Sequence, residues 1–261
     1  ATDLMPPAEP GAVPSYTLPP FDLLEPLVDP SLSKIDVDPT ATAQLLIDTL
    51  SEFGIEGQIN NVEVGPVVTS YEVLPAPGVR VERISNLANN LALSLKATSI
   101  RVQAPIPGKG VVGIEVPNDK SQLVQIRGIV EGRAWRTSKA ALPLVLGKDV
   151  GGKDLVVDLA AMPHLLIAGA TGAGKTVCMN SILAGLLMSR TPEQMRLMLV
   201  DPKIVEFSVY ENLPHLVVPV ITDAKKVCLG LRWAINEMES RYKLFAKVGV
   251  RNIASYNSRE I

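Results

Sequence analysis

Hydrophobic residues follow one rhythm in the first half of the chain and another in the second. TATAQLLIDTLSEFGI repeats apolar residues at helical spacing as far as Gly54, and VVTSYEVLP then alternates as a strand does. ISNLANNLALSL returns to helical spacing, and SIRVQAPIP and GVVGIEVP predict two strands joined by a turn at 107–110. Together these elements predict a small mixed α/β domain over residues 41–119.

After about residue 120 the pattern changes to short, continuously apolar runs separated by helical stretches. The runs are DLVVDL, HLLIAG, RLMLVD and LVVPVIT. Strands with both faces buried in a parallel sheet under covering helices have this pattern. The last helix is predicted from Asp223 to about Val248, with an apolar stripe from Val227 to Phe245. Residues 120–261 are therefore predicted to form an α/β domain with a mainly parallel sheet.

The first 40 residues have a different composition from the rest of the chain. They contain nine of the 21 prolines. Proline removes backbone donors and favours extended chain, so residues 1–40 are predicted to be a linker that lies on a surface. Within it, the apolar stretch FDLLEPLV at 21–28 is expected to dock onto a neighbouring domain.

Composition and charge narrow the class of protein. With 47% hydrophobic and 20% charged residues, the 261-residue chain has a globular composition. No apolar run approaches the roughly 18 residues of a membrane-spanning helix. The net charge of −2 is uneven, because residues 1–40 carry seven acids and one base, which leaves 24 bases and 20 acids in the remainder. That remainder is compatible with a polyanionic partner without requiring one. The two cysteines are expected to be buried thiols.

The stretch GATGAGKT matches the phosphate-loop pattern G-x-x-x-x-G-K-[ST] in full. It follows an apolar run and opens a helical one, which favours a nucleotide-binding loop over a glycine-rich turn. Glycines let backbone N–H groups curve around phosphates, a lysine neutralises them, and a threonine hydroxyl ligates Mg²⁺. We therefore predict ATP and Mg²⁺ as cofactors, with Thr176 on the metal and Lys175 and Thr176 as catalytic residues. The predicted binding residues are Gly169, Ala170, Thr171, Gly172, Ala173, Gly174, Lys175 and Thr176.

Hydrolysis also needs a second acid that holds Mg²⁺, often the first residue of an Asp-Glu pair after an apolar strand. The chain contains no Asp-Glu pair, and the nearest equivalent, Asp201, is followed by Pro202. Either Asp201 is an unusual metal ligand or the metal-binding acid lies beyond Ile261, and we favour the second. Asp201 and Lys203 follow a predicted strand, where α/β sheets bind ligands, so both are candidates for a place near the nucleotide. The alternative is a turn shaped by Pro202.

Two arginines on the last predicted helix are candidates for contact with a neighbouring subunit's nucleotide. Arg232 and Arg241 lie on this helix, from which assembly into a ring would bring one of them to a neighbour's γ-phosphate. Glu237 stands four residues before Arg241, however, and this spacing is also that of an ordinary surface ion pair. Lys109 in the 107–110 turn is a weaker candidate for a phosphate-backbone contact, with a solvated turn lysine as the alternative.

Several blocks resemble the FtsK/SpoIIIE family of double-stranded DNA translocases. MPHLLIAGATGAGKT, VDPKIVEFSVYENLPHLVVPVITD and LRWAINEMESRYKLFAKVGVRNIASYN resemble its motor core, and GPVVTSYEV and PIPGKGVVGIEVPN resemble its α domain. The resemblance covers residue 40 to the end. It implies an α domain at 41–119 and an incomplete RecA-like P-loop ATPase domain at 120–261.

The resemblance also implies a function. It indicates a homo-hexameric ring that pumps double-stranded DNA in chromosome segregation and cell division, the cytoplasmic motor region of a protein anchored in the bacterial inner membrane through an N-terminal segment outside this chain. The family's metal acid follows the RNIASYN block, so this fragment alone is expected to bind nucleotide poorly and not to turn over. Two alternatives stay open: a related ring ATPase of a protein secretion system, and a nucleotide-binding scaffold without turnover.

Overall fold

The structure is a computed structural model, and it describes residues 16–28 and 38–259. The chain forms two compact units, one of Pro19–Ser189 and one that combines Ala1–Leu18 with Arg190–Ile261. Each unit is described by itself.

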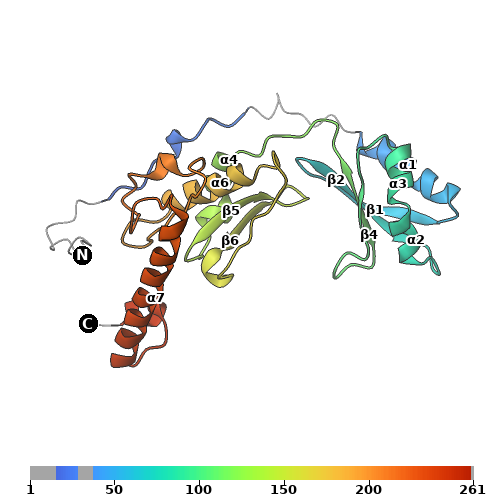
Figure 1. Cartoon of the computed structure of the whole chain (residues 1–261). Helices are drawn as coiled ribbons and strands as arrows, with labels where there is room; N and C mark the ends of the chain where they lie inside the picture. Colours follow the sequence, from blue (N-terminus) through green and yellow to red (C-terminus); the bar gives the residue numbers. More distant parts are fainter. Residues whose placement is uncertain (1–15, 29–37, 260–261) are drawn as a thin grey trace. The chain divides into compact units, whose positions relative to one another are not determined.

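The first half of the larger unit contains a four-stranded antiparallel sheet with the order β1-β2-β4-β3 (Figure 1). Its strands are β1 (Gly57–Val64), β2 (Val68–Pro75), β3 (Arg101–Gln103) and β4 (Val112–Pro117). The β3–β4 connection contains the predicted turn, in which the N–H of Lys109 donates to the carbonyl oxygen of Ile106 over 3.0 Å. The three predicted strands are confirmed as β2, β3 and β4, whereas β1 was not predicted.

Three helices complete this part: α1 (Pro39–Glu52), α2 (Val81–Asn86) and α3 (Ala88–Ser94). The Asp38 carboxylate caps α1 by accepting the N–H groups of Thr40 and Ala41, and the helix ends just before Gly54, which has a φ of +67°. The predicted single helix at 84–95 is two short helices, which meet at Leu87.

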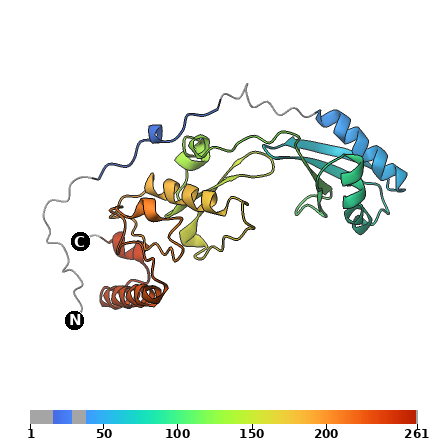
Figure 2. The same ribbon diagram turned by 45° about the horizontal axis from the view of Figure 1, so that its top comes forward.

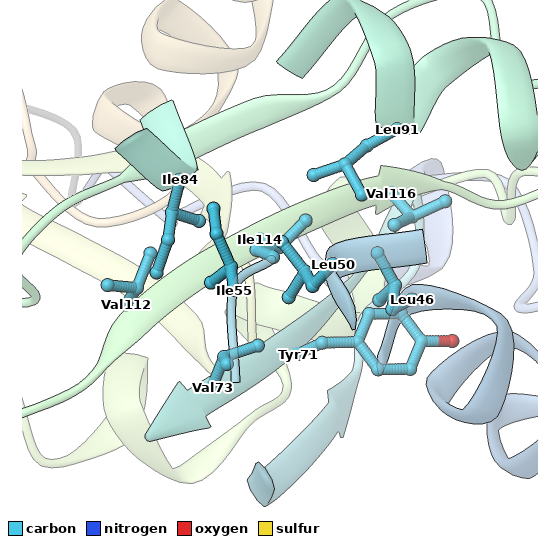
Figure 3. Packing of buried hydrophobic residues seen from close by; sticks show 10 residues of the cluster. All are labelled: Leu46, Leu50, Ile55, Tyr71, Val73, Ile84, Leu91, Val112, Ile114 and Val116. Atoms are coloured by element: carbon cyan, nitrogen blue, oxygen red, sulfur yellow. The ribbon is translucent and has the colours of Figure 1, made fainter. Parts of the chain in front are cut away.

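The core of this part lies on one face of the sheet, where β2 and β4 present alternate residues to the helices (Figures 2 and 3). Tyr71 pairs with Ile114 and Val73 with Val112 across the strands, so all four side chains point to the same face. The buried cluster consists of Leu46, Leu50, Ile55, Tyr71, Val73, Ile84, Leu91, Val112, Ile114 and Val116. This core confirms the apolar helix faces predicted for this part of the chain, and the domain bounds 41–119 stay a prediction.

The apolar stretch at 21–28 docks as expected, and we call residues 19–28 the strap. It contains the short 3-10 helix η1 (Phe21–Leu23) and lies against α4 (Ile126–Val130). Arg127 donates to the carbonyl oxygen of Leu24 and to the Asp22 carboxylate, both over 3.1 Å. Phe21 and Leu24 pack against a small core of three buried side chains, Ile129, Val130 and Val145.

The second half of the larger unit holds α5 (Arg133–Arg136), a two-stranded sheet and α6 (Lys175–Leu187). The strands are β5 (Pro143–Lys148) and β6 (Asp154–Asp158), and they pair antiparallel. A 3-10 turn, η2 (Leu159–Ala161), follows β6, with the Asp158 carboxylate accepting the N–H of Ala160. The run DLVVDL is thus a strand, although not a parallel one.

The smaller unit consists mainly of helices and loops. Segments 197–201 and 215–221 run parallel and share two isolated bridges, Leu197 with Leu216 and Val200 with Ile221. They are followed by α7 (Ala224–Lys247), which begins and ends within one residue of the predicted helix and is capped by Asp223, and by α8 (Ile253–Asn257). The 3-10 helix η3 (Ser208–Tyr210) lies between the two segments. Most of the predicted apolar stripe of α7 is exposed, and only Phe245 of that stripe is buried. None of the helices in the described residues is both long enough and apolar enough to cross a membrane.

The mainly parallel sheet predicted for 120–261 is not seen in the described residues. HLLIAG forms no strand, and its Leu166 is 91% exposed. A run that is apolar on both faces becomes a strand only when neighbouring strands satisfy its backbone groups. Among the described residues no strand pairs with this run, and RLMLVD and LVVPVIT form only the two isolated bridges. The described fold is mixed α/β with small antiparallel sheets.

Candidate nucleotide-binding site

The phosphate loop folds into a tight turn because two of its glycines adopt left-handed backbone angles. Gly172 has a φ of +82° and Gly174 a φ of +85°, a region that residues with a Cβ rarely adopt. Between them, the N–H of Ala173 donates to the carbonyl oxygen of Ala170 over 3.0 Å. Gly174 is the N-cap of α6, so the turn leads directly into the helix at Lys175.

The loop is accessible, and the helix behind it is oriented to attract an anion. Residues 168–174 are exposed, and Lys175 and Thr176 in the first turn of α6 are half-buried. The N–H of Cys178 donates to the carbonyl oxygen of Gly174 over 2.9 Å, which begins the helical ladder. A helix does not use its first amides internally, and its N-terminus carries partial positive charge. A loop with this backbone, a lysine and a threonine fits a triphosphate with its Mg²⁺.

α6 is held in place by its opposite end. The inner face predicted for it is buried, with half-buried Met179 nearest the loop, and comprises Ile182, Leu183, Leu186 and Leu187. Gly185 lies so close to β5 and α5 that an added Cβ would stand 3.2 Å from Val145 and 3.4 Å from Trp135. Both cysteines are free, but Cys178 is half-buried and Cys228 exposed, so the expectation of two buried thiols is wrong.

Asp201 organises the loop that follows it in the smaller unit. Its side chain is buried, and its carboxylate accepts backbone N–H groups from Lys203, Val205, Glu206 and Phe207 at 2.8–3.3 Å. The bond from Phe207 is the largest influence that holds the pKa of Asp201 below its ordinary value, against the effect of burial. These bonds are those of a residue that shapes a turn, the alternative that Pro202 suggested.

Sequence reasoning did not foresee this fourfold capping, although aspartate before a turn commonly bonds the backbone that follows it. Lys203 is exposed. Both Asp201 and Lys203 belong to the smaller unit, whereas the phosphate loop belongs to the larger one. Their place near a nucleotide stays a prediction.

The two arginines proposed to act in trans are both exposed on α7. The Nε of Arg241 donates to the Glu237 carboxylate over 2.7 Å, with both side chains partly exposed. The predicted surface ion pair is therefore confirmed. A role for Arg232 or Arg241 at a neighbour's nucleotide stays a prediction.

Lys109 is engaged within its own domain. Its ammonium pairs with Glu72 of β2, a carboxylate that is almost fully buried, while the lysine itself is half-exposed. The hydrogen bond from Lys109 is the largest influence that holds the pKa of Glu72 below its ordinary value. The β3–β4 turn is thereby fastened to the sheet.

Comparison with known proteins assigns both parts of the chain. Residues 18–118 match the family model for the FtsK alpha domain, and residues 125–261 match the model for the FtsK/SpoIIIE family. Relatives named DNA translocase FtsK are 47% identical over 94% of this chain in Caldanaerobacter subterraneus subsp. tengcongensis and 46% identical over 93% in Pseudomonas syringae pv. tomato. Another, from Azospirillum brasilense, is 46% identical over 94% of the chain.

These alignments extend over less of the relatives than of this chain. They cover 34%, 30% and 39% of the three relatives, so the chain spans about a third of their length. The FtsK/SpoIIIE model, which matches residues 125–261, alone covers more than half of this chain. This chain, with its alpha-domain sheet followed by a glycine-capped phosphate loop, belongs to the FtsK/SpoIIIE family.

Proposed function

We propose that this chain is part of an ATP-driven double-stranded DNA translocase that works as a homo-hexameric ring in chromosome segregation and cell division. The observation that carries the proposal is the phosphate loop at the exposed N-terminus of α6, in a chain 46–47% identical to DNA translocases over most of its length. In the proposed protein, residues 1–40 are a linker, residues 41–119 form the α domain, and residues 120–261 form part of a RecA-like P-loop ATPase domain.

The loop residues would hold ATP through backbone donors and one cation. The turn made by Gly172 and Gly174 directs amides toward phosphate oxygens, and the Lys175 ammonium neutralises them. The Thr176 hydroxyl would ligate Mg²⁺. When bound, Mg-ATP supplies a phosphoanhydride bond whose cleavage releases free energy. Asp201, Lys203, Arg232 and Arg241 are proposed to lie near a nucleotide in the assembled ring, and membrane attachment is proposed through a segment outside this chain.

The test is ATP turnover by the full-length protein that contains this chain, measured with and without duplex DNA. Lys175→Ala is expected to abolish the DNA-stimulated turnover and leave the fold intact, because the residue lies at a loop and supports no core. Lys139→Ala is the matched control, since Lys139 is an exposed lysine in the same unit outside the loop. It should turn over like wild type.

Three outcomes would contradict the proposal. They are wild-type turnover by Lys175→Ala, equal loss in the Lys139→Ala control, and turnover that duplex DNA does not stimulate. Nucleotide binding without any turnover would favour the scaffold alternative.

A further inference from the structure

The strap, residues 19–28, lies on α4 in the manner of a bound peptide (Figure 1). Of its described residues, only the three of η1 have regular secondary structure. On either side of η1 the backbone has polyproline II angles, with φ −72° and ψ 150° at Pro20 and φ −83° and ψ 147° at Leu24. Proline fixes φ near these values, and the strap also contains Pro19 and Pro26. A segment restricted in this way before it docks loses little conformational entropy on docking.

Gln125, the N-cap of α4, binds the main chain of the strap through both polar atoms of its amide. The amide nitrogen donates to the carbonyl oxygen of Pro26 over 2.9 Å, and the amide oxygen accepts the N–H of Val28 over 2.7 Å. A neighbouring β-strand offers an extended peptide the same combination of donor and acceptor. Gln125 therefore recognises the extended backbone of the strap.

Arg127 binds the earlier half of the strap and contributes a positive charge. Its guanidinium is oriented by Glu131, to which it donates over 2.9 Å. It also donates to the carbonyl oxygen of Leu24 and to the Asp22 carboxylate, each over 3.1 Å, so the charges of the two sides are complementary. Together the two side chains engage every second residue from 22 to 28, which is the spacing of peptide recognition by strand addition.

Three apolar side chains of the strap contact the surface beside these bonds. Phe21 and Leu24 pack against the small core beneath α4, and Leu27 lies over Gly128, where an added Cβ would stand 3.4 Å from it. These contacts are shallow, because Leu27 stays 51% exposed and Leu23 72% exposed. A segment with so few buried apolar contacts opens locally at a lower cost than the fold around it.

The site at α4 has no means of distinguishing its own strap from that of another copy. The four hydrogen bonds join residues that are 97 to 105 positions apart in the chain. A second copy carries the same strap, so every contact can form between two copies as it does within one. The two arrangements differ in the effective concentration of the strap, which a flexible tether sets at about millimolar within one copy and close assembly raises between neighbours.

We propose that the strap site at α4 takes the strap of a second copy of this chain, so that neighbouring copies exchange their straps. In the exchanged form, Phe21 and Leu24 of one copy pack beneath α4 of the other, and no contact is needed that a single copy lacks. The ten steps of chain from Val28 to Asp38 span at most about 36 Å, so exchange takes place between adjacent copies. The strap site is distinct from the phosphate loop, and the exchange does not require a nucleotide.

The first test traps an exchanged strap with a disulfide. One copy carries Leu27→Cys and another Gly128→Cys, both in a background of Cys178→Ser and Cys228→Ser. The two sulfurs meet only when the strap of the first copy lies on α4 of the second. Oxidation of the full chains mixed at about 1 mM, near the effective concentration of a tethered strap, should give a linked dimer. Leu23→Cys, at a side chain that faces solvent, replaces Leu27→Cys in the matched control and should link at least about tenfold more slowly.

A single chain that carries both Leu27→Cys and Gly128→Cys tests the contact itself. In dilute solution it should close an intramolecular disulfide, because its own strap occupies the site. Closure within the single chain, without any linked dimer in the mixture, would overturn the exchange. Failure of the single chain to close would overturn the strap contact on which the exchange depends.

The second test asks whether the linked dimer uses the bonds described above. Gln125→Ala, added to the copy that carries Gly128→Cys, removes both bonds to the strap main chain. The initial rate of dimer formation is expected to fall at least about fivefold. Arg133→Gln, which changes an exposed residue of the neighbouring α5, should leave the rate unchanged.

The strap as a free peptide distinguishes exchange from chance collision. A synthetic peptide of residues 19–28 competes for the same site, and at about 5 mM it should slow dimer formation roughly fivefold. The same peptide with Phe21→Ser and Leu24→Ser lacks the apolar anchors and should have no effect. A linked dimer whose rate neither the peptide nor Gln125→Ala reduces would overturn the proposal, because it forms without the strap site.

Discussion

Gly174 connects the phosphate loop to α6, and replacing it by alanine tests whether its left-handed angle is what holds a nucleotide. Its φ is +85°, and no atom lies within 4 Å of the place where a Cβ would stand. The substitution therefore introduces no clash, and its whole effect comes from the backbone. A residue with a Cβ pays about 1–2 kcal/mol to adopt the left-handed region.

This cost translates into a loss of affinity. If the loop of the free variant relaxes out of the left-handed angle, nucleotide binding must restore that angle. The apparent affinity is then the intrinsic affinity multiplied by the fraction of molecules whose loop is already left-handed. A difference of about 1–2 kcal/mol raises the dissociation constant for Mg-ATP roughly 5- to 30-fold. If the loop of the variant stays left-handed, the free energy of unfolding falls by the same about 1–2 kcal/mol.

The assay is titration of a fluorescent ATP analogue into the full-length protein, with urea unfolding measured in parallel. Gly108→Ala is the control, because Gly108 also has a positive φ of +77° and open space around its Cβ position, but lies in the β3–β4 turn. It should lose stability and keep its affinity. If Gly174→Ala binds the analogue as tightly as wild type at unchanged stability, or if Gly108→Ala weakens binding equally, the reasoning fails.

Three further changes test the packing and the caps. Ile114→Ala should lower the free energy of urea unfolding by about 2–5 kcal/mol, because it empties part of a fully buried core, whereas Leu93→Ala at an exposed site should change it little. Backbone N–H groups, that of Phe207 foremost, hold the pKa of Asp201 below its ordinary value, so its stabilising contribution is present above the ordinary pKa and is lost as the pH falls through the folded pKa. Urea midpoints of Asp201→Asn should therefore depend less on pH in the acid range than those of wild type. Arg127→Gln removes two bonds to the strap, so chymotrypsin should cut at 21–27 faster than in wild type or in an Arg133→Gln control.

The parts of the fold that could be predicted are those that local sequence specifies. The α1 helix face, the β3–β4 turn and the bounds of α7 each depend on residues within a few positions of one another. The phosphate loop is of the same kind, because Gly172 and Gly174 supply its angles without help from distant residues.

The sheet of the second half could not be predicted in the same way. Apolar runs indicate that a segment seeks burial, but a strand also needs a partner for each of its backbone groups. DLVVDL finds one in β5 and pairs antiparallel, whereas HLLIAG finds none among the described residues. The fourfold capping by Asp201 was missed for a related reason, because only the folded loop shows which four amides converge on one carboxylate.

The strap contributes to the stability of the second half of the larger unit, where it supports both α4 and α6. Only three side chains form the buried core beneath α4, and Phe21 and Leu24 pack against them from more than 100 residues earlier in the chain. Val145 of that same core lies beside Gly185 of α6, where an added Cβ would stand 3.2 Å from it, and the other end of that helix carries the phosphate loop. Because two strap residues pack against so small a core, loss of the strap should loosen the support of α6 as well as of α4. Residues 19–28 of the predicted linker are therefore a structural part of the half that holds the phosphate loop, and the α-domain sheet lies in the sequence between two stretches of chain that pack on each other.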